Sequence, residues 1–485
     1  MVSRPNFITR LKPCVLMLLF WCLLTKVHGQ GFQSITPLQP VSAVKNTGEK
    51  PQSKVWKYDG QWWAVFPVTS GTYIWRLDGT TWTNTTKISS STSVEADCKV
   101  AGNLCHIFLW RNGNNASQLI SLEYNLAAKS YELWKKRSST VFIQLDSGAE
   151  TGTIDIDGTG RMWLASDGLD DMRVRWSDSP YAAWSLPVTV ASGTTDDDIC
   201  AVIALPVQRQ IGILWSDQNS KRFGFKTHRD EDPPTVWSDD EIPASRSALD
   251  IGKGMGDDHL NLALASDGTL YGAVKTSYDT PGYTRLGLLK RSPSGTWDDL
   301  YNVSETGTRA IVVLNDSAGT LKVVYTSQEH GGEILYRESS IFPISFGPAL
   351  TLIAGAYDNP TSSKDAYQSD IVILASDGKT IVSILGRDHT LITGVVSPES
   401  GESVVGVYPN PVDDELLTVN LDEAITKDFS ISISDASGKI YNKNNQMLQG
   451  RRIEVNLSEG SLPPGAYFLK LQTPKYSRVF NFIKK

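Results

Sequence analysis

Short apolar segments, each preceded by a polar turn that usually contains glycine, recur along most of the chain. Each segment ends near a threonine, serine or arginine, and the repeat is about 50 residues long. The copies occupy residues 61–69, 103–111, 159–166, 211–216, 269–277, 320–327 and 379–387. Apolar segments of this length, bounded by turns, indicate β-strands. Seven such units predict an all-β, seven-bladed β-propeller in which each unit is a four-stranded sheet.

A large aromatic residue follows the next apolar strand in six of the units. These residues are Trp82, Trp134, Trp184, Trp237, Trp297 and Phe346. A ring at the start of an outer strand can be buried between neighbouring sheets, so we expect packing roles and not a set of sugar-stacking rings. The preceding turns, such as LDGTTW and RSPSGTW, resemble degenerate Asp-box turns of sialidase-like and lectin-like propellers. The resemblance extends only to the architecture, because the early arginines Arg76 and Arg111 lie outside any sialidase motif.

The seventh unit has only two clear strands, within residues 369–376 and 380–386. An open sheet edge invites aggregation, so another segment is needed to cover it. Residues 32–44, near the N-terminus, are the available candidate. We therefore expect this segment to complete the last sheet.

Strict alternation of apolar and polar residues returns in the last part of the chain. The alternating apolar residues are Ile431 and Ile433, then Ile453, Val455 and Leu457, then Tyr467, Leu469 and Leu471. Glycine and proline turns separate these runs. A period of two with one buried face predicts a small antiparallel, Ig-like β-sandwich.

The same segment carries several short motifs. They are Tyr408-Pro409-Asn410-Pro411, the hairpin turn Asp435-Ala436-Ser437-Gly438, Pro464-Gly465-Ala466-Tyr467 and the terminal Lys484-Lys485. On these motifs, residues 405–485 resemble the type A C-terminal sorting domain of the bacterial type IX secretion system. The resemblance implies contact with the secretion machinery and a final location in the medium or on the outer cell surface.

The N-terminus has the features of a secretory signal peptide. Basic residues precede an apolar run at 14–24, and small residues follow before Gly29, where we expect cleavage. An apolar run this short does not span a bilayer as a permanent anchor. We expect no transmembrane anchor in the mature chain, because no other run of this kind occurs.

Charge narrows the class of partner. Loss of residues 1–29 removes four positive charges and no acid, which takes the formal net charge from −7 to about −11. An acidic protein of this kind is a poor partner for nucleic acid, which requires a basic surface. The cysteine and histidine spacing does not suggest a zinc site.

In a propeller, the first strand of each unit begins at the same face at which the second strand ends. Candidate ligand-binding residues lie at these two places. They are Asp257, Asp258, Asn261, Lys275, Tyr278, Tyr283, Glu329 and Arg387. Carboxylates accept hydrogen bonds from sugar hydroxyls, and the tyrosines offer stacking faces. This set predicts a carbohydrate site on the loops of the fifth and sixth units.

Two other interpretations of these loops remain open, besides that of ordinary solvated residues. His259 or His330 could act as a general base with Tyr325 as the acid, which is the chemistry of a polysaccharide lyase. Alternatively, Asp197, Asp198 and Asp258 could hold calcium, which prefers oxygen ligands.

The sequence thus predicts four parts: a signal peptide at 1–29, a propeller at 30–395, a linker at 396–404 and the sorting domain at 405–485. The expected function is binding of an extracellular glycan or a surface partner. The alternative is a polysaccharide-degrading enzyme of the lyase or glycoside hydrolase type.

Overall fold

The computed structural model describes residues 31–48, 51–112 and 115–388, together with parts of 406–484. The chain forms two compact units that divide between His389 and Thr390. The predicted signal peptide and the predicted linker lie outside the described residues.

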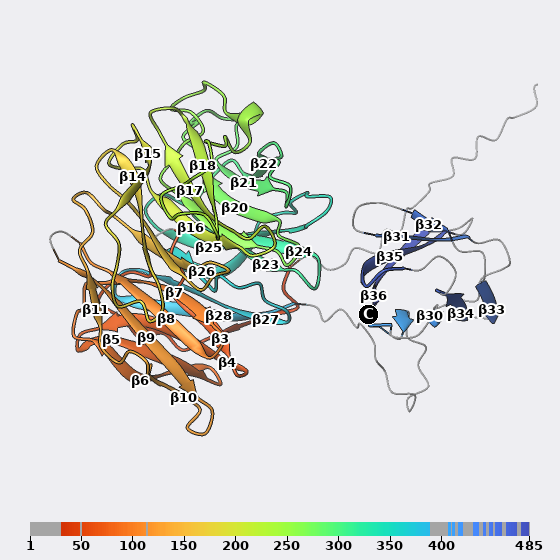
Figure 1. Cartoon of the computed structure of the whole chain (residues 1–485), viewed down its shortest axis with the longest axis horizontal. Coiled ribbons are helices and arrows are strands. Elements are labelled where there is room, and N and C mark those ends of the chain that lie inside the picture. Colours follow the sequence, from red (N-terminus) through yellow and green to blue (C-terminus); the bar gives the residue numbers. More distant parts are fainter. Residues whose placement is uncertain are drawn as a thin grey trace, which may run out of the picture. The chain divides into compact units, whose positions relative to one another are not determined.

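The first unit is built from antiparallel sheets that follow one another along the chain (Figure 1). The first two sheets comprise β3 (Val55–Tyr58), β4 (Gln61–Val68), β5 (Gly71–Asp78) and β6 (Thr81–Ser89), then β7 (Glu95–Ala101), β8 (Leu104–Trp110), β9 (Ser117–Asn125), β10 (Ser130–Leu133) and β11 (Val141–Ile143). The third and fourth comprise β12 (Gly152–Ile156), β13 (Met162–Asp167), β14 (Asp171–Ser177) and β15 (Val188–Ser192), then β16 (Cys200–Leu205), β17 (Gln210–Asp217) and β18 (Arg222–Arg229). A short 3-10 turn, η1 (Ser245–Ser247), precedes the fifth sheet, which contains β19 (Leu260–Leu264), β20 (Leu270–Lys275), β21 (Leu286–Arg291) and β22 (Tyr301–Ser304).

The last sheet of this unit has eight strands. They are β23 (Thr308–Asn315), β24 (Thr320–Thr326), β25 (Gly332–Ser340), β26 (Leu350–Thr361), β27 (Asp370–Ser376), β28 (Thr380–Arg387), β1 (Ser34–Pro37) and β2 (Val41–Ser42). One end of the long strand β26 pairs with β25 and the other end with β27, which joins two groups of strands into one sheet. The N-terminal strands β1 and β2 both pair with β28, so the predicted closure by residues 32–44 is confirmed.

Apolar cores lie between consecutive sheets of this unit. The core between the first and second sheets contains Trp56 and Ile107, for example, and the core between the third and fourth contains Trp163 and Ile213. A further core joins the eight-stranded sheet to the first sheet. Figure 1 shows the same arrangement, with β27 and β28 next to β3 and β4. Sheets that pack in sequence and return to the first one form a β-propeller.

The six predicted aromatic residues all pack into these cores, which confirms their structural role. Trp82 and Trp134 are buried, and the other four are part-buried against core residues. Trp82 also donates a hydrogen bond from Nε1 to Ser383 Oγ at 3.0 Å. Because Trp82 lies on β6 and Ser383 on β28, this contact joins the first sheet to the last.

A buried charged cluster joins the two ends of the propeller. Lys322, which is 1% exposed, places Nζ 2.7 Å from Asp388 Oδ1 and 2.9 Å from both Glu338 Oε2 and the Tyr367 hydroxyl. The same ammonium lies 4.5 Å from the ring centre of Phe32, near the N-terminus. Burial, and then the nearby Asp388 carboxylate, raise the pKa of Tyr367, so its hydroxyl stays a donor to Asp388.

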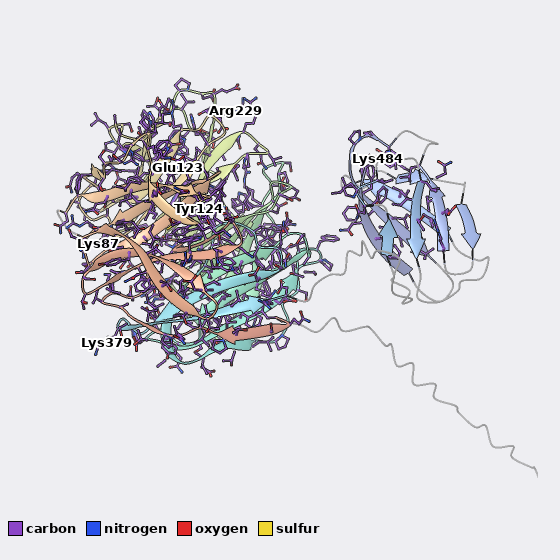
Figure 2. All side chains as sticks on the ribbon, turned by 90° about the horizontal axis from the view of Figure 1, so that it is seen from below. Lys87, Glu123, Tyr124, Arg229, Lys379 and Lys484 are labelled. Atoms are coloured by element: carbon purple, nitrogen blue, oxygen red, sulfur yellow. The ribbon has the colours of Figure 1, made fainter. Side chains whose placement is uncertain are left out.

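The second unit contains two four-stranded antiparallel sheets around one core. The sheets comprise β29 (Gly406–Tyr408), β30 (Leu416–Asn420), β34 (Arg452–Asn456) and β33 (Gln446–Gln449), then β32 (Ile440–Asn442), β31 (Ser430–Asp435), β35 (Gly465–Gln472) and β36 (Ser477–Lys484). The eight alternating residues predicted to face inward all belong to the core, so the β-sandwich is confirmed. Asn410 of the Tyr-Pro-Asn-Pro motif is bonded to β36 through Asn481 and Ile483, and Figure 2 labels Lys484 on the same strand.

Candidate functional site

The first strands of neighbouring sheets bring several of the predicted residues together. Asp257, Asp258 and His259 directly precede β19, and Thr308 begins β23 in the next sheet. His259 Nδ1 lies 2.7 Å from Asp257 Oδ1 and 2.5 Å from Asp258 Oδ1. Its Nε2 lies 3.2 Å from Thr308 Oγ1. Both ring nitrogens are therefore engaged, and the side chain connects the two sheets.

Lys275, at the end of β20, extends this polar network. Its Nζ lies 3.5 Å from Asp257 Oδ2 and donates to Glu329 Oε1 at 2.9 Å. Arg285 Nη2 lies 3.6 Å from the other oxygen of Glu329. Burial alone would raise the pKa of Glu329, but the bond and charge of Lys275, together with His259 and Arg285, hold it below its ordinary value. The half-exposed Glu329 is therefore ionised at neutral pH.

A pocket of about 490 Å³ opens beside this network, and we name it the Tyr283 pocket. Its lining residues are Tyr278, Asp279, Thr280, Pro281, Tyr283, Thr284, Arg285, Glu305, Thr306, Gly307, Ser327, Gln328 and Glu329. The rings of Tyr278 and Tyr283 lie 5.9 Å apart at 57°. Tyr278 is 3% exposed and donates a hydrogen bond from its hydroxyl to the carbonyl of Ser247. This buried ring packs against the more exposed ring of Tyr283.

The structure leaves four other predicted residues out of the lining of this pocket. Tyr325 is 1% exposed and belongs to the apolar core between β19–β21 and β23–β24. Asn261 lies within β19, where its side-chain oxygen accepts a bond from the backbone N–H of Val312. His330 is exposed on the loop after β24, and Arg387 ends β28 opposite Asp370. None of these four residues lines the Tyr283 pocket.

The three predicted calcium ligands are not brought into one group. Asp198 is fully buried and accepts bonds from the backbone N–H groups of Thr195 and Gln218, and Asp197 accepts a bond from the Gln218 side chain. Within the described residues, the one group of side chains close enough to share a metal ion is Asp257, Asp258 and His259. The ammonium of Lys275 already lies beside this group, so a cation there would meet a positive charge.

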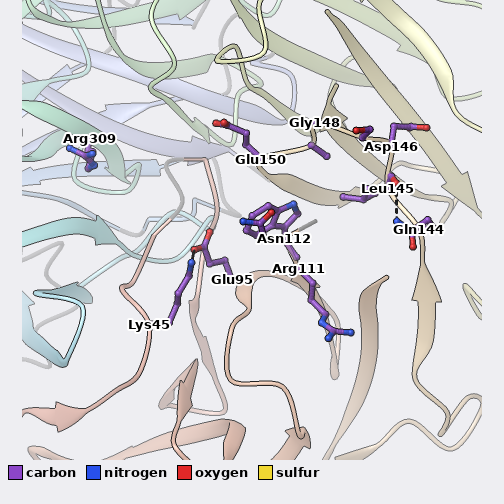
Figure 3. Close-up of a pocket in the computed structure, with 13 residues that line it drawn as sticks. Lys45, Glu95, Arg111, Asn112, Gln144, Leu145, Asp146, Gly148, Glu150 and Arg309 are labelled. Carbon is purple, nitrogen blue, oxygen red and sulfur yellow. Dashed lines mark hydrogen bonds and ion pairs between the residues drawn. The ribbon is translucent and has the colours of Figure 1, made fainter. Parts of the chain in front are cut away.

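A second pocket, of about 530 Å³, lies near the beginning of β7, β12 and β23, and we name it the Arg111 pocket. Its lining residues are Lys45, Glu95, Trp110, Arg111, Asn112, Gln144, Leu145, Asp146, Ser147, Gly148, Ala149, Glu150 and Arg309. Figure 3 shows Arg309 across the pocket from Arg111 and Asp146. None of these residues was predicted from the sequence as a ligand-binding group. The loop at 144–150 lacks any regular spacing, although its Asp-Ser-Gly turn was a usable signal.

The carboxylate of Asp167 lies beneath this loop. It accepts backbone hydrogen bonds from Glu150 and Thr151, at 2.6 and 3.1 Å, and is fully buried. Burial raises the pKa of Asp167 to about 7 despite these two bonds. Between its ordinary value of 3.8 and about 7, the folded protein therefore holds a proton that the unfolded chain has lost.

We expect the stability of the propeller to fall as pH rises through this window, by at most about 1.4 kcal/mol per pH unit from Asp167. Asp167→Asn cannot titrate, so it should remove this part of the pH dependence. Urea unfolding at roughly pH 4.5 and 7.5 tests this, and tryptophan fluorescence reports the propeller alone because residues 390–485 contain no tryptophan. Equal pH dependence in the wild type and the variant would contradict the prediction.

Comparison with known proteins identifies the C-terminal unit. Residues 406–485 match the family described as the secretion system C-terminal sorting domain. This segment is therefore a sorting domain, and the protein is exported by type IX secretion to the medium or the cell surface. No curated protein sequence matches the chain. Within the described residues, no helix has the length and apolar character needed to cross a membrane.

Solved structures similar to this chain were also found. The polysaccharide lyase Uly1 is 8% identical, with a TM-score of 0.44, and covers 74% of this chain and 99% of its own. A protein of unknown function from Dyadobacter fermentans is 11% identical, with a TM-score of 0.41, and the match covers 73% of this chain and 100% of that protein. The β-propeller domain of Cps50 (Swd1) from Myceliophteria thermophila is 8% identical, with a TM-score of 0.42, and the match covers 72% of this chain and 99% of that domain. At these TM-scores the likenesses say nothing about the ligand or activity of this chain.

Proposed function

We propose that this secreted protein binds an extracellular glycan in the Tyr283 pocket. The observation that supports the proposal best is the make-up of this pocket, in which a tyrosine ring supported by a second ring faces charged and hydroxyl side chains. Sugars present an apolar ring face and a belt of hydroxyl groups, and such a pocket complements both. Arg285 and Glu329 supply a donor and an acceptor that are already held in place by ion pairs.

The architecture places this pocket on loops, where ligand sites of rigid β-scaffolds commonly lie. We interpret the eight-stranded sheet as two blades joined by β26, which gives the propeller seven blades. The cleaved signal peptide at 1–29 supplies entry to the export route in this proposal. A sialidase-like activity is not part of it, because the resemblance to that group concerns only turns.

A glycan array with the mature protein tests the proposal. We expect retention of a defined set of glycans, and Tyr283→Ala should weaken it at least about tenfold, since loss of a stacking ring costs about 1.4 kcal/mol or more. Tyr73→Ala is the matched control, because Tyr73 is also part-buried but lies on β5. An array without retention, or equal loss in both variants, would count against the proposal.

The alternative function is a polysaccharide-degrading enzyme of the lyase or hydrolase type. The pairing of Asp257 with His259 Nδ1 favours it, because a carboxylate in this position fixes the tautomer of a catalytic imidazole. We rank it second because His259 is 3% exposed and its Nε2 faces Thr308. If the wild type cleaves a glycan that it binds on the array, and His259→Ala does not, the enzyme becomes the preferred function.

A further inference from the structure

The Tyr283 pocket and the Arg111 pocket share a wall. Arg309 lines the Arg111 pocket, and its Nη1 donates to the carbonyl oxygen of Glu329 at 2.9 Å. Glu329 lines the Tyr283 pocket and lies 3.6 Å from Arg285 Nη2 on the far side. A ligand that occupied both pockets would therefore lie near Arg309.

Arg309 has a strained backbone. It lies within β23 with φ at +51°, a left-handed conformation that favours glycine. The pairing of β23 with β24 shifts register between Thr308 and Ile311, so a β-bulge directs the arginine out of the regular ladder. Strain of this kind inside a strand persists where the surrounding structure enforces it and is concentrated at functional sites. Glycine would adopt this backbone conformation without strain, so the presence of arginine points to a use of its side chain.

The charges of the two pockets leave arginine donors available. Glu95 is paired with Lys45 at 2.9 Å, and Asp146 is paired with Arg175 and Arg173 at 2.6 and 2.8 Å. By contrast, no acidic side chain among the described residues pairs with Arg111, whose Nη1 donates to the carbonyl of Ala116.

Arg309 likewise has spare donors. Its nearest acid is Asp358, whose Oδ2 lies 3.6 Å from Nη1. A guanidinium has five N–H donors in a planar fork, so both Arg111 and Arg309 can bind a further oxyanion.

We propose that the two pockets form one elongated site for an acidic polysaccharide, with Arg309 as the residue that selects its carboxylate or sulfate groups. This inference rests on the proposed glycan-binding function. Tyr283 contacts one sugar of the chain, while Arg309 and Arg111 bind acidic groups further along it. Affinity then rises with chain length until both pockets are filled.

The test measures binding of the mature protein by calorimetric titration. The probes are the dimer and hexamer of galacturonate, heparin oligosaccharides of matching lengths, and neutral xylo-oligosaccharides. We expect the acidic hexamers to bind more tightly than the dimers, and binding to weaken with added salt. Binding of the galacturonate series shows that carboxylates suffice, whereas binding of only the heparin series, which carries both groups, shows that sulfate is required. Either result supports the proposal.

Three variants distinguish selection by Arg309 from a fold effect. Arg309→Gly should lower affinity for the acidic hexamer about tenfold, as expected for one lost charge-assisted bond. The melting temperature should change little, because relief of the backbone strain offsets the lost contacts to Glu329 and Asp358 and the added chain entropy of glycine. Glu305→Gln, which removes an exposed acid from the rim of the Tyr283 pocket, should strengthen acidic binding. Arg229→Ala, an exposed residue on the propeller shown in Figure 2, should change neither quantity.

Unchanged hexamer affinity in Arg309→Gly would overturn the inference, as would hexamers that bind no more tightly than dimers. Binding of the neutral series that depends on Tyr283, without binding of the acidic series, would overturn this inference alone. Absence of binding by every probe and every arrayed glycan would overturn the proposed function as well.

Discussion

Lys322→Met is expected to lower the free energy of unfolding of the propeller by about 3–5 kcal/mol, the usual cost of removing one partner from a buried ion pair. Asp388 and Glu338 would each lose the ammonium that neutralises them. The methionine fills a similar volume, so the loss comes from charges left unpaired and not from a cavity. Since this cluster joins Phe32 to Asp388, the change weakens the junction between the two ends of the propeller.

Urea unfolding followed by tryptophan fluorescence measures this loss. Lys379→Met is the matched control, because Lys379 is exposed on the turn between β27 and β28 and is labelled in Figure 2. The control should change stability by no more than about 0.5 kcal/mol. A Lys322 variant as stable as the control would show that the cluster contributes little.

Trp82→Ala is expected to cost about 3–5 kcal/mol, because removal of a buried tryptophan leaves a cavity that the surrounding sheets cannot fill. The ring is 5% exposed, lies 6.4 Å from the ring of Phe66 at 88°, and belongs to the core that joins the first sheet to the last. It also donates to Ser383 on β28. The loss should therefore appear as weakened closure of the propeller.

Ser383→Ala separates the hydrogen bond from the packing. It removes the acceptor and leaves the ring in place, so a loss of only about 1 kcal/mol is expected. The same unfolding measurement applies to both variants. Comparable losses in the two would mean that the ring contributes little burial, contrary to the structure.

Much of the fold could be predicted because its signals are local and repeated. Apolar segments between glycine turns became strands, and alternation in the C-terminal unit identified buried residues such as Ile433 and Leu469. The aromatic residues were predictable as packing groups because their size favours burial between sheets. Pairing of β1 with β28 was predictable because the last sheet had an edge to cover.

The candidate site was only partly predictable. Proximity of Asp257, His259, Lys275 and Glu329 followed from the strand order. The direction of Tyr325 did not, because every residue from Leu321 to Thr326 is buried and the run Val323-Val324-Tyr325 has no alternation to read. The role proposed for Arg309 depends on a positive φ at a β-bulge, which no pattern in the sequence indicates.

A crystal structure of the mature protein with its tightest-binding array glycan tests the central claim most directly. The account predicts a sugar ring against Tyr283, with hydroxyl groups bonded to Arg285 and Glu329. A glycan bound elsewhere on the propeller, with the Tyr283 pocket filled only by solvent, would contradict it.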